Sequence, residues 1–290
     1  MKGWLIVNNF IKSGKFDEIY SYLLRAAEKE SVELELIKSG MLPHSVSALK
    51  NISDRADFAL FWDKDTVLAR QLEICGLRLF NSASAVEKCD NKAYTYIELE
   101  KTGIPFPETY VAPLTFEGVP IDDFGFAEDA AARLGFPLVV KELAGSFGKQ
   151  VYLAEKMDAL KEIISGIGHK GFLLQKFAAS SRGRDIRVNV VGGKVICSML
   201  RYSVSGDFRS NVTLGGHALP YELNDEQTEI SLRACEALGL DFAGVDLLFG
   251  EDGKPLVCEV NSNPHFKSSL DVTGKDLSEY IIKHVIDTLG

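Results

Sequence analysis

Near the C-terminus, apolar runs carry three oxygen-bearing side chains that could together hold a metal ion. "FAGVDLLFG" contains Asp246, and "KPLVCEVNSNP" contains Glu259 and Asn261. The Asp252-Gly253 pair between them favours a two-residue hairpin turn, which would place Asp246 opposite Glu259 with Asn261 on the same face. Such oxygen ligands suit Mg²⁺ or Mn²⁺. The alternative is a slipped register in which both carboxylates are merely solvated.

A second group of residues could bind phosphate. The strand-like run "PLVVKEL" contains Lys141, and the turn "AGSFGKQ" follows it directly. A buried ammonium needs an anion, and Gly145, Ser146 and Gly148 would let backbone N–H groups approach a phosphate. The alternatives are a lysine at a sheet edge with its amine in solvent and a plain glycine-rich hairpin. The turn is not a Walker A loop, because no G-K-[ST] ends it.

Arginines supply a third set of charges. Arg187, Arg201 and Arg209 occur in and after two alternating strand patterns around Gly192-Gly193. We expect these three around a cleft, since the arginine fork matches phosphate and carboxylate oxygens. Arg182 and Arg184 are interpreted as solvated.

The elements that must position these residues follow from hydrophobic periodicity. Residues 1–86 read as a small parallel α/β layer, with strands at "GWLIVNNF", "VELELIKS", "ADFALFWDKD" and "LRLFNSAS" and helices at "FDEIYSYLLRAAEKES" and "TVLARQLEICG". One helix is predicted over "VEKCDNKAYTYIELEKTG", ending at Gly103. A helix, a strand, the glycine turn, a strand and a helix follow, then "FLLQKF" and the two hairpins.

Composition limits the classes of function. The 290 residues are 46% hydrophobic and 25% charged, with a net charge of −9, which disfavours nonspecific binding to nucleic acid or anionic membranes. Five scattered cysteines without a C-x-x-C pair indicate neither a disulfide framework nor a zinc knuckle, so we expect a reducing cytoplasm. No apolar run reaches the ~18 residues of a membrane span, and the N-terminus reads as a strand rather than a signal peptide.

With these residues in view, the sequence resembles the ATP-grasp superfamily and, within it, RimK-like carboxylate–amine ligases. The resemblance runs from "AVEKCDNKAYTYIELEKTGIPFPET" to "CEVNSNP" through seven segments in order: "DNK", "PLVVKELAGSFG", "LLQKF", "RDIRVNVVGGKV", "GDFRSNVTLGG", "AGVDLL" and "CEVNSNP". It implies an α/β (α+β) ATP-grasp fold with ATP bound between two α+β lobes. The implied units are an N-terminal pre-ATP-grasp layer at 1–86, a central lobe at 87–178 and a C-terminal lobe at 179–290.

The resemblance also implies roles for individual residues. Phosphate contacts come from Lys92, Lys141 and the covering loop Gly145, Ser146, Phe147 and Gly148. Adenine is held along Gln175, Lys176, Phe177 and Ala178, and ribose by Asp185. The transferring phosphoryl group is neutralised by Arg201 and Arg209, with Asn211 nearby. Two Mg²⁺ ions, or Mn²⁺, are held by Asp246, Glu259 and Asn261.

The implied reaction is ATP-dependent amide formation, in which a carboxylate attacks the γ-phosphate and an amine then attacks the acyl-phosphate, releasing ADP and phosphate. Its substrates are a small-molecule or peptide carboxylate and an amine from an amino acid, a peptide or a protein tail; family members are often dimers or tetramers. Two departures weaken the match: Lys149-Gln150 replaces a frequent loop glycine, and Lys176 replaces a frequent hinge glutamate.

Other interpretations stay open at this stage. An ATP-grasp phosphotransferase would use the same arginines and metals, and a nucleotide-binding module without catalysis would fit the altered loop. His217 and His265 could touch substrate, although histidines are more often structural or exposed. Phe266 and Lys267 could shape the acceptor end.

Overall fold

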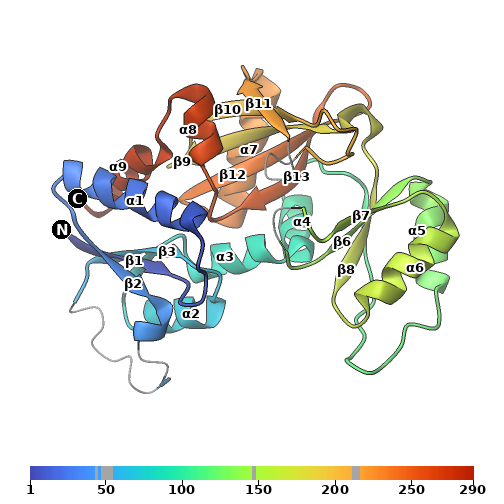
Figure 1. The fold of residues 1–290 in the computed structure, drawn as a ribbon, viewed down its shortest axis with the longest axis horizontal. Helices are drawn as coiled ribbons and strands as arrows, with labels where there is room; N and C mark the ends of the chain where they lie inside the picture. Colours follow the sequence, from blue (N-terminus) through green and yellow to red (C-terminus); the bar gives the residue numbers. More distant parts are fainter. Residues whose placement is uncertain (43–44, 47–54, 146–147, 211–215) are drawn as a thin grey trace.

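The computed structural model describes residues 1–42, 45–46, 55–145, 148–210 and 216–290. Figure 1 shows an N-terminal α/β layer, a small α/β lobe at the opposite end, and a third sheet near the first layer. Each of the three sheets is built from one stretch of the chain. The mixed α/β class predicted from the sequence is therefore confirmed.

The first sheet has the order β2-β1-β3-β4 and is parallel throughout, as predicted. Its buried strands are nearly continuous apolar runs, as expected for a parallel sheet covered by helices. The elements are β1 (Lys2–Val7), α1 (Gly14–Lys29), β2 (Glu33–Lys38), the 3₁₀ turn η1 (Ser39–Met41), β3 (Phe58–Trp62), α2 (Thr66–Ile74) and β4 (Arg78–Phe80).

The single helix predicted before Gly103 is wrong: two helices are present, α3 (Ala83–Asp90) and α4 (Lys92–Lys101). Asn91 between them is extended, and its side chain accepts hydrogen bonds from the backbone N–H groups of Ala93 and Tyr94. Asparagine is among the best N-terminal caps, so it restarts the helix. Periodicity continued across this break, and the cap was overlooked. The break makes Lys92 the first residue of α4.

The second sheet has the order β5-β8-β6-β7 and is antiparallel. It forms the lobe on the right of Figure 1, where α5 and α6 cover one face. The elements are β5 (Thr109–Val111), α5 (Gly125–Leu134), β6 (Leu138–Glu142), β7 (Val151–Ala154), α6 (Met157–Ile167) and β8 (Phe172–Lys176). The strand containing Lys141 and, after the glycine turn, a strand and a helix are thus found as predicted.

The third sheet has the order β11-β10-β9-β12-β13 and is antiparallel. The predicted hairpin at Gly192-Gly193 is confirmed: both glycines have positive φ, and Val191 pairs with Lys194. The elements are the 3₁₀ turn η3 (Ala179–Ser181), β9 (Arg184–Val191), β10 (Lys194–Tyr202), β11 (His217–Pro220), α7 (Asp225–Leu238), β12 (Phe242–Phe249), β13 (Pro255–Asn261), α8 (Lys267–Thr273) and α9 (Leu277–Leu289).

The N-terminal layer and the third sheet share a core. Helix α9, red in Figure 1, lies beside α1, blue, and its apolar face joins the cluster that contains Leu5, Ile19 and Phe242. Asn81, fully buried, joins the same two parts with hydrogen bonds to the backbone of residues 241, 242 and 262. No helix formed by the described residues is long and apolar enough to cross a bilayer.

Candidate active site

The carboxylate pair expected on the last hairpin is present. Asp246 on β12 stands opposite Glu259 on β13, and Gly244 stands opposite Asn261. Asp246, Glu259 and Asn261 all line one cavity. The predicted convergence of three oxygen-bearing side chains is therefore found in the described structure.

The turn that led to this prediction is wrong. The ladder pairs Phe249 with Pro255, and the connecting loop closes with a hydrogen bond from Gly250 N–H to the carbonyl of Lys254. That geometry shifts the register by one residue relative to a two-residue loop. A bulge, which leaves Cys258 unpaired, shifts it back before Glu259. Bulges insert one residue and re-aim neighbouring side chains, so the right pair results from two compensating irregularities.

Two arginines hold Asp246 in the buried centre of the site. Arg187 Nε and Nη2 donate to the two carboxylate oxygens of Asp246, and Arg201 Nη2 lies 3.0 Å from Asp246 Oδ2. Burial favours the neutral acid, but the charges of Arg187 and Arg201 outweigh it, so the pKa of Asp246 lies below its ordinary value. Asp246 therefore stays ionised and able to act as a metal ligand.

Arg201 also forms a bidentate pair with Asp185, with N···O distances of 2.7 and 2.6 Å. Burial opposes the charge of Arg201, but the two aspartates more than offset it and raise its pKa. Asp185 thus lies in the predicted cavity, with both carboxylate oxygens engaged by Arg201. Arg187, which we expected near the cleft, is the second arginine of this buried cluster.

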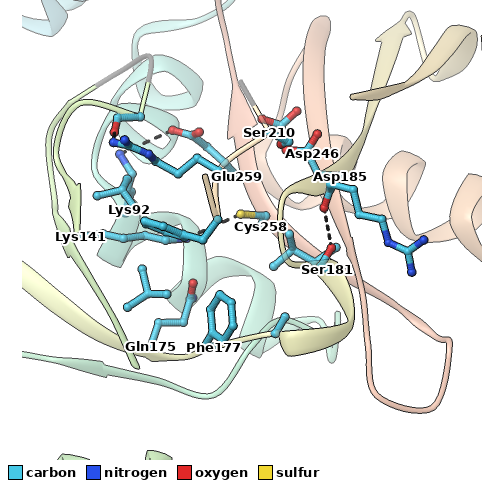
Figure 2. Close-up of a pocket in the computed structure, with 18 of the residues that line it drawn as sticks. Lys92, Lys141, Gln175, Phe177, Ser181, Asp185, Ser210, Asp246, Cys258 and Glu259 are labelled. Atoms are coloured by element: carbon cyan, nitrogen blue, oxygen red, sulfur yellow. Dashed lines mark hydrogen bonds and ion pairs between the residues drawn. The ribbon is translucent and has the colours of Figure 1, made fainter. Parts of the chain in front are cut away.

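Two lysines face the carboxylates from the other side of the site (Figure 2). Lys92 Nζ lies 3.5 Å from Glu259 Oε1 and donates to the carbonyl of Gly145 at 3.2 Å. Buried Lys141 lies 3.5 Å from the Tyr96 hydroxyl and 3.6 Å from Cys258 Sγ. Burial lowers the pKa of Lys141, but its interactions with Cys258, Tyr96 and Glu259 raise it overall above the ordinary value. The interpretation of Lys141 as a lysine with its amine in solvent is therefore wrong.

The two described glycines of the turn contact charged side chains of the cavity. Gly145 and Gly148 line the cavity and both have positive φ, whereas Ser146, Phe147 and, further on, Asn211 lie outside the described residues. Arg209 Nη1 donates to the carbonyl of Gly148 at 2.8 Å, and its other nitrogens pair with Asp207. Arg209 therefore connects Gly148 to the segment that follows β10.

The predicted adenine segment borders the same cavity. Gln175, Lys176, Phe177 and Ala178 all line it, with apolar walls from Val139 and Leu248. Gln175 is buried and donates to the Thr109 hydroxyl at 2.8 Å. Lys176 is exposed and lies 3.4 Å from Glu251. An apolar slot of this kind suits a flat heteroaromatic ring.

The donor set fits a divalent cation. The Glu259 side chain is 32% exposed and has Lys92 as its ion-pair partner at 3.5 Å, while Asn261 adds an amide oxygen on the same face. Carboxylate and amide oxygens are the ligands hard cations prefer. Histidine, cysteine and carboxylate side chains of the described residues form no metal-binding cluster of three or more, so the site requires Asn261 or phosphate oxygens to complete its coordination.

A second cavity adjoins the first and shares Gly148, Arg201, Asp246 and Glu259 with it. Its volume is about 390 Å³. Its far wall was missed from the sequence: it comprises Asn8, Ile11, Phe16, Trp62, Asp63, Lys64, Asn263 and Ser268. Several of these residues follow β1 and β3 directly, and ligands of open α/β sheets bind outside the carboxyl ends of the strands. This rule could have predicted from the sequence that residues after β1 and β3 line a binding cavity.

The four weaker candidates have different outcomes. His265 lines the second cavity and contacts the Lys15 carbonyl, and burial lowers its pKa. His217 is exposed and stacks on Tyr202. Phe266 is fully buried in the core and packs edge-on against Trp62, which lines the second cavity. Lys267 pairs with Asp271 on the surface.

Comparison with solved structures identifies the fold. The crystal structure of D-alanine–D-alanine ligase from Bacillus anthracis in complex with ATP matches 100% of this chain and 97% of its own, with a TM-score of 0.74 and 21% identity. At that identity the likeness shows the fold, which is ATP-grasp.

Sequence comparison identifies the family. The model of the RimK-like ATP-grasp domain matches residues 89–285, and the chain belongs to this family. N-acetylaspartylglutamate synthase A of Homo sapiens is 40% identical over 73% of this chain and 54% of its own. A probable alpha-L-glutamate ligase of Coxiella burnetii is 37% identical over 76% of this chain and 71% of its own. The chain spans about half the length of the first curated relatives it matches.

Proposed function

We propose that this protein is an ATP-dependent ligase that joins a carboxylate to an amine through an acyl-phosphate. One observation carries the proposal: Asp246 and Glu259 pair at the junction of two cavities, with lysines on one side and arginines on the other. The first cavity has apolar walls and phosphate-binding groups, and the second is open for substrates. The relatives' names support L-glutamate as the first amine to test.

The residues can account for the chemistry by position and charge alone. Lys92 and Lys141 hold the phosphates of ATP, while Arg201 and Arg209 face the phosphoryl group as it moves to the substrate carboxylate. Phosphoryl transfer depends chiefly on such positioning and charge neutralisation. A divalent ion bound by Asp246, Glu259 and Asn261 would neutralise phosphate charge and polarise the γ-phosphate. The neutral amine then attacks the acyl carbon: the C–N bond forms, the C–O bond to phosphate breaks, and the nitrogen loses one proton to the departing phosphate or to solvent.

Finer assignments belong to the same proposal. We assign two Mg²⁺ or Mn²⁺ ions to the metal site and adenine binding to Gln175–Ala178. We assign ribose binding to Asp185, which would give up one of its two hydrogen bonds from Arg201 to accept one from the ribose. The chain divides into units at 1–86, 87–178 and 179–290, a division supported by the three sheets. Five free thiols support the cytoplasm as its location, and a homo-oligomer is proposed from the family.

The test is ATP-dependent product formation by the purified protein with MgCl₂, L-glutamate and a panel of carboxylic acids. We expect phosphate release to require both substrates, and hydroxylamine to divert the intermediate to a hydroxamate. ATP consumption that transfers phosphate stably to a hydroxyl group would contradict the proposal, as would binding of Mg²⁺-ATP without turnover across the panel.

Glu259→Gln tests the proposed metal ligand within that assay. It keeps the shape of the side chain but removes its charge, so we expect turnover to fall by at least about 100-fold, the size of loss typical when one electrostatic group of such a site is removed. Glu229→Gln on the exposed face of α7, where Glu229 pairs with Arg233, is the matched control and should keep full activity. Equal activity of both variants would refute the metal role.

A further inference from the structure

The second cavity contains two buried acceptor oxygens that no hydrogen-bond donor among the described residues reaches. They are Asp63 Oδ2 and Asn263 Oδ1. Both residues line the cavity, and Asp63 is only 5% exposed. A buried polar atom without a partner costs about 1–3 kcal/mol, and more when it is charged. Two such atoms in one cavity therefore point to a ligand that supplies donors.

Neighbouring hydrogen bonds fix both side chains. Asp63 follows β3, and its Oδ1 accepts from Asn8 Nδ2 at 3.1 Å and from Lys64 N–H at 2.7 Å. Asn263 Nδ2 donates to the Asp63 carbonyl at 3.0 Å. One oxygen of Asp63 and the amide nitrogen of Asn263 are thus engaged, and the remaining oxygen of each is left for a ligand.

The chemistry of the missing partner follows from these groups. Among the described residues, Asp63 has no ion-pair partner. The ammonium of the neighbouring Lys64 pairs with Asp90 instead. A carboxylate and an amide oxygen both accept hydrogen bonds, and a primary ammonium offers three donors, no acceptor and a positive charge. Resting on the proposed ligase function, we propose that Asp63 and Asn263 bind the ammonium group of the amine substrate.

The position of this pair suits the reaction. The same cavity contains Asp246, Glu259 and Arg201, beside which the acyl-phosphate would form. Arg187 and Arg201 at that end of the cavity attract anionic groups, whereas Asp63 attracts the ammonium of an amino acid. The amino nitrogen is thus held in the same cavity as the carbonyl that it would attack. Trp62, beside Asp63, supplies an apolar wall. Asp63 thereby selects a charged amine. The ammonium must lose one proton before its nitrogen can attack, and the Asp63 carboxylate that holds it can accept that proton.

Asp63→Asn is the matched test variant. Its oxygen can keep the hydrogen bonds from Asn8 and Lys64, and its new amide group takes the place of the oxygen that has no donor. A charge-assisted hydrogen bond is worth about 1.5–3 kcal/mol, so we expect the KM for L-glutamate to rise about 10- to 100-fold. The KM for ATP and the rate of hydroxamate formation, which uses uncharged hydroxylamine, should stay within twofold of wild type.

Asp65→Asn is the control, because Asp65 caps α2, does not line either cavity, and asparagine is an equally good cap. It should leave all three constants unchanged. An unchanged KM for L-glutamate in the active Asp63→Asn variant would overturn the proposal, as would parallel loss of hydroxamate formation. If wild-type protein forms neither amide nor hydroxamate, the proposed function itself fails, which separates the two ideas.

Discussion

Asn81→Ala is predicted to destabilise the protein strongly, because this side chain connects the N-terminal layer to the third sheet. Its Nδ2 donates to the carbonyls of Phe242 and Ser262 at 2.9 and 2.8 Å, and its Oδ1 accepts from the N–H groups of Asp241 and Phe242 at 2.7 and 3.3 Å. Alanine removes all four hydrogen bonds from a fully buried position. At about 1 kcal/mol per hydrogen bond, the free energy of unfolding should fall by roughly 4 kcal/mol, a large part of the 5–15 kcal/mol typical of proteins.

The assay is urea unfolding followed by tryptophan fluorescence, since Trp62 stacks on Phe242 at this interface. Asn224→Ala is the control: it removes the capping box of α7 near the surface, for which a loss of about 1 kcal/mol is expected. If Asn81→Ala costs no more than Asn224→Ala, the inference that Asn81 holds the two parts together is refuted.

Two further predictions concern single side chains in the cavities. Gln150→Met should raise the KM for ATP about fivefold, which corresponds to one hydrogen bond of about 1 kcal/mol, because Gln150 Oε1 is buried in the first cavity and no described residue donates to it. Thermal unfolding of the free variant should occur at an unchanged or higher temperature, and an unchanged KM would contradict this. Burial lowers the pKa of His265, so the unfolded chain binds more protons than the folded one as pH falls through the ordinary value of about 6.5. Stability should therefore decrease from pH 7.5 to pH 5.5, and this decrease should be smaller in His265→Asn, as measured by urea unfolding; equal decreases would refute the assignment.

Much of the architecture could be predicted from the sequence because periodicity reports local burial. The parallel layer, the strand containing Lys141 and the hairpin at Gly192-Gly193 all follow from such patterns. The break at Asn91 was missed for the same reason, since apolar spacing continues across it while the capping side chain ends one helix and begins another. The hydrogen bonds of the Asn91 side chain set that boundary, and hydrophobic periodicity does not report such hydrogen bonds.

The site was predictable only in part. Asp246 and Glu259 lie on adjacent strands joined by a short loop, so their pairing could be inferred even though loop and bulge were both unforeseen. Asp63 and Asn263, by contrast, meet across 200 residues of sequence. Their contact depends on how the carboxyl end of a parallel sheet docks against a separate hairpin, and no local pattern encodes that packing.

The charge balance among the side chains of the site bears on which form of the nucleotide it would bind. Arg187 and Arg201 are compensated by Asp185 and Asp246, so this buried cluster is neutral as it stands. Nucleotide phosphates that entered without a cation would place further negative charge beside the carboxylates of Asp246 and Glu259. Repulsion between these like charges, away from water, would cost binding free energy. A divalent cation entering with the phosphates removes that penalty. On the proposed function, we expect the site to favour the metal–nucleotide complex over free ATP, because the charges of Arg187 and Arg201 are already compensated by Asp185 and Asp246.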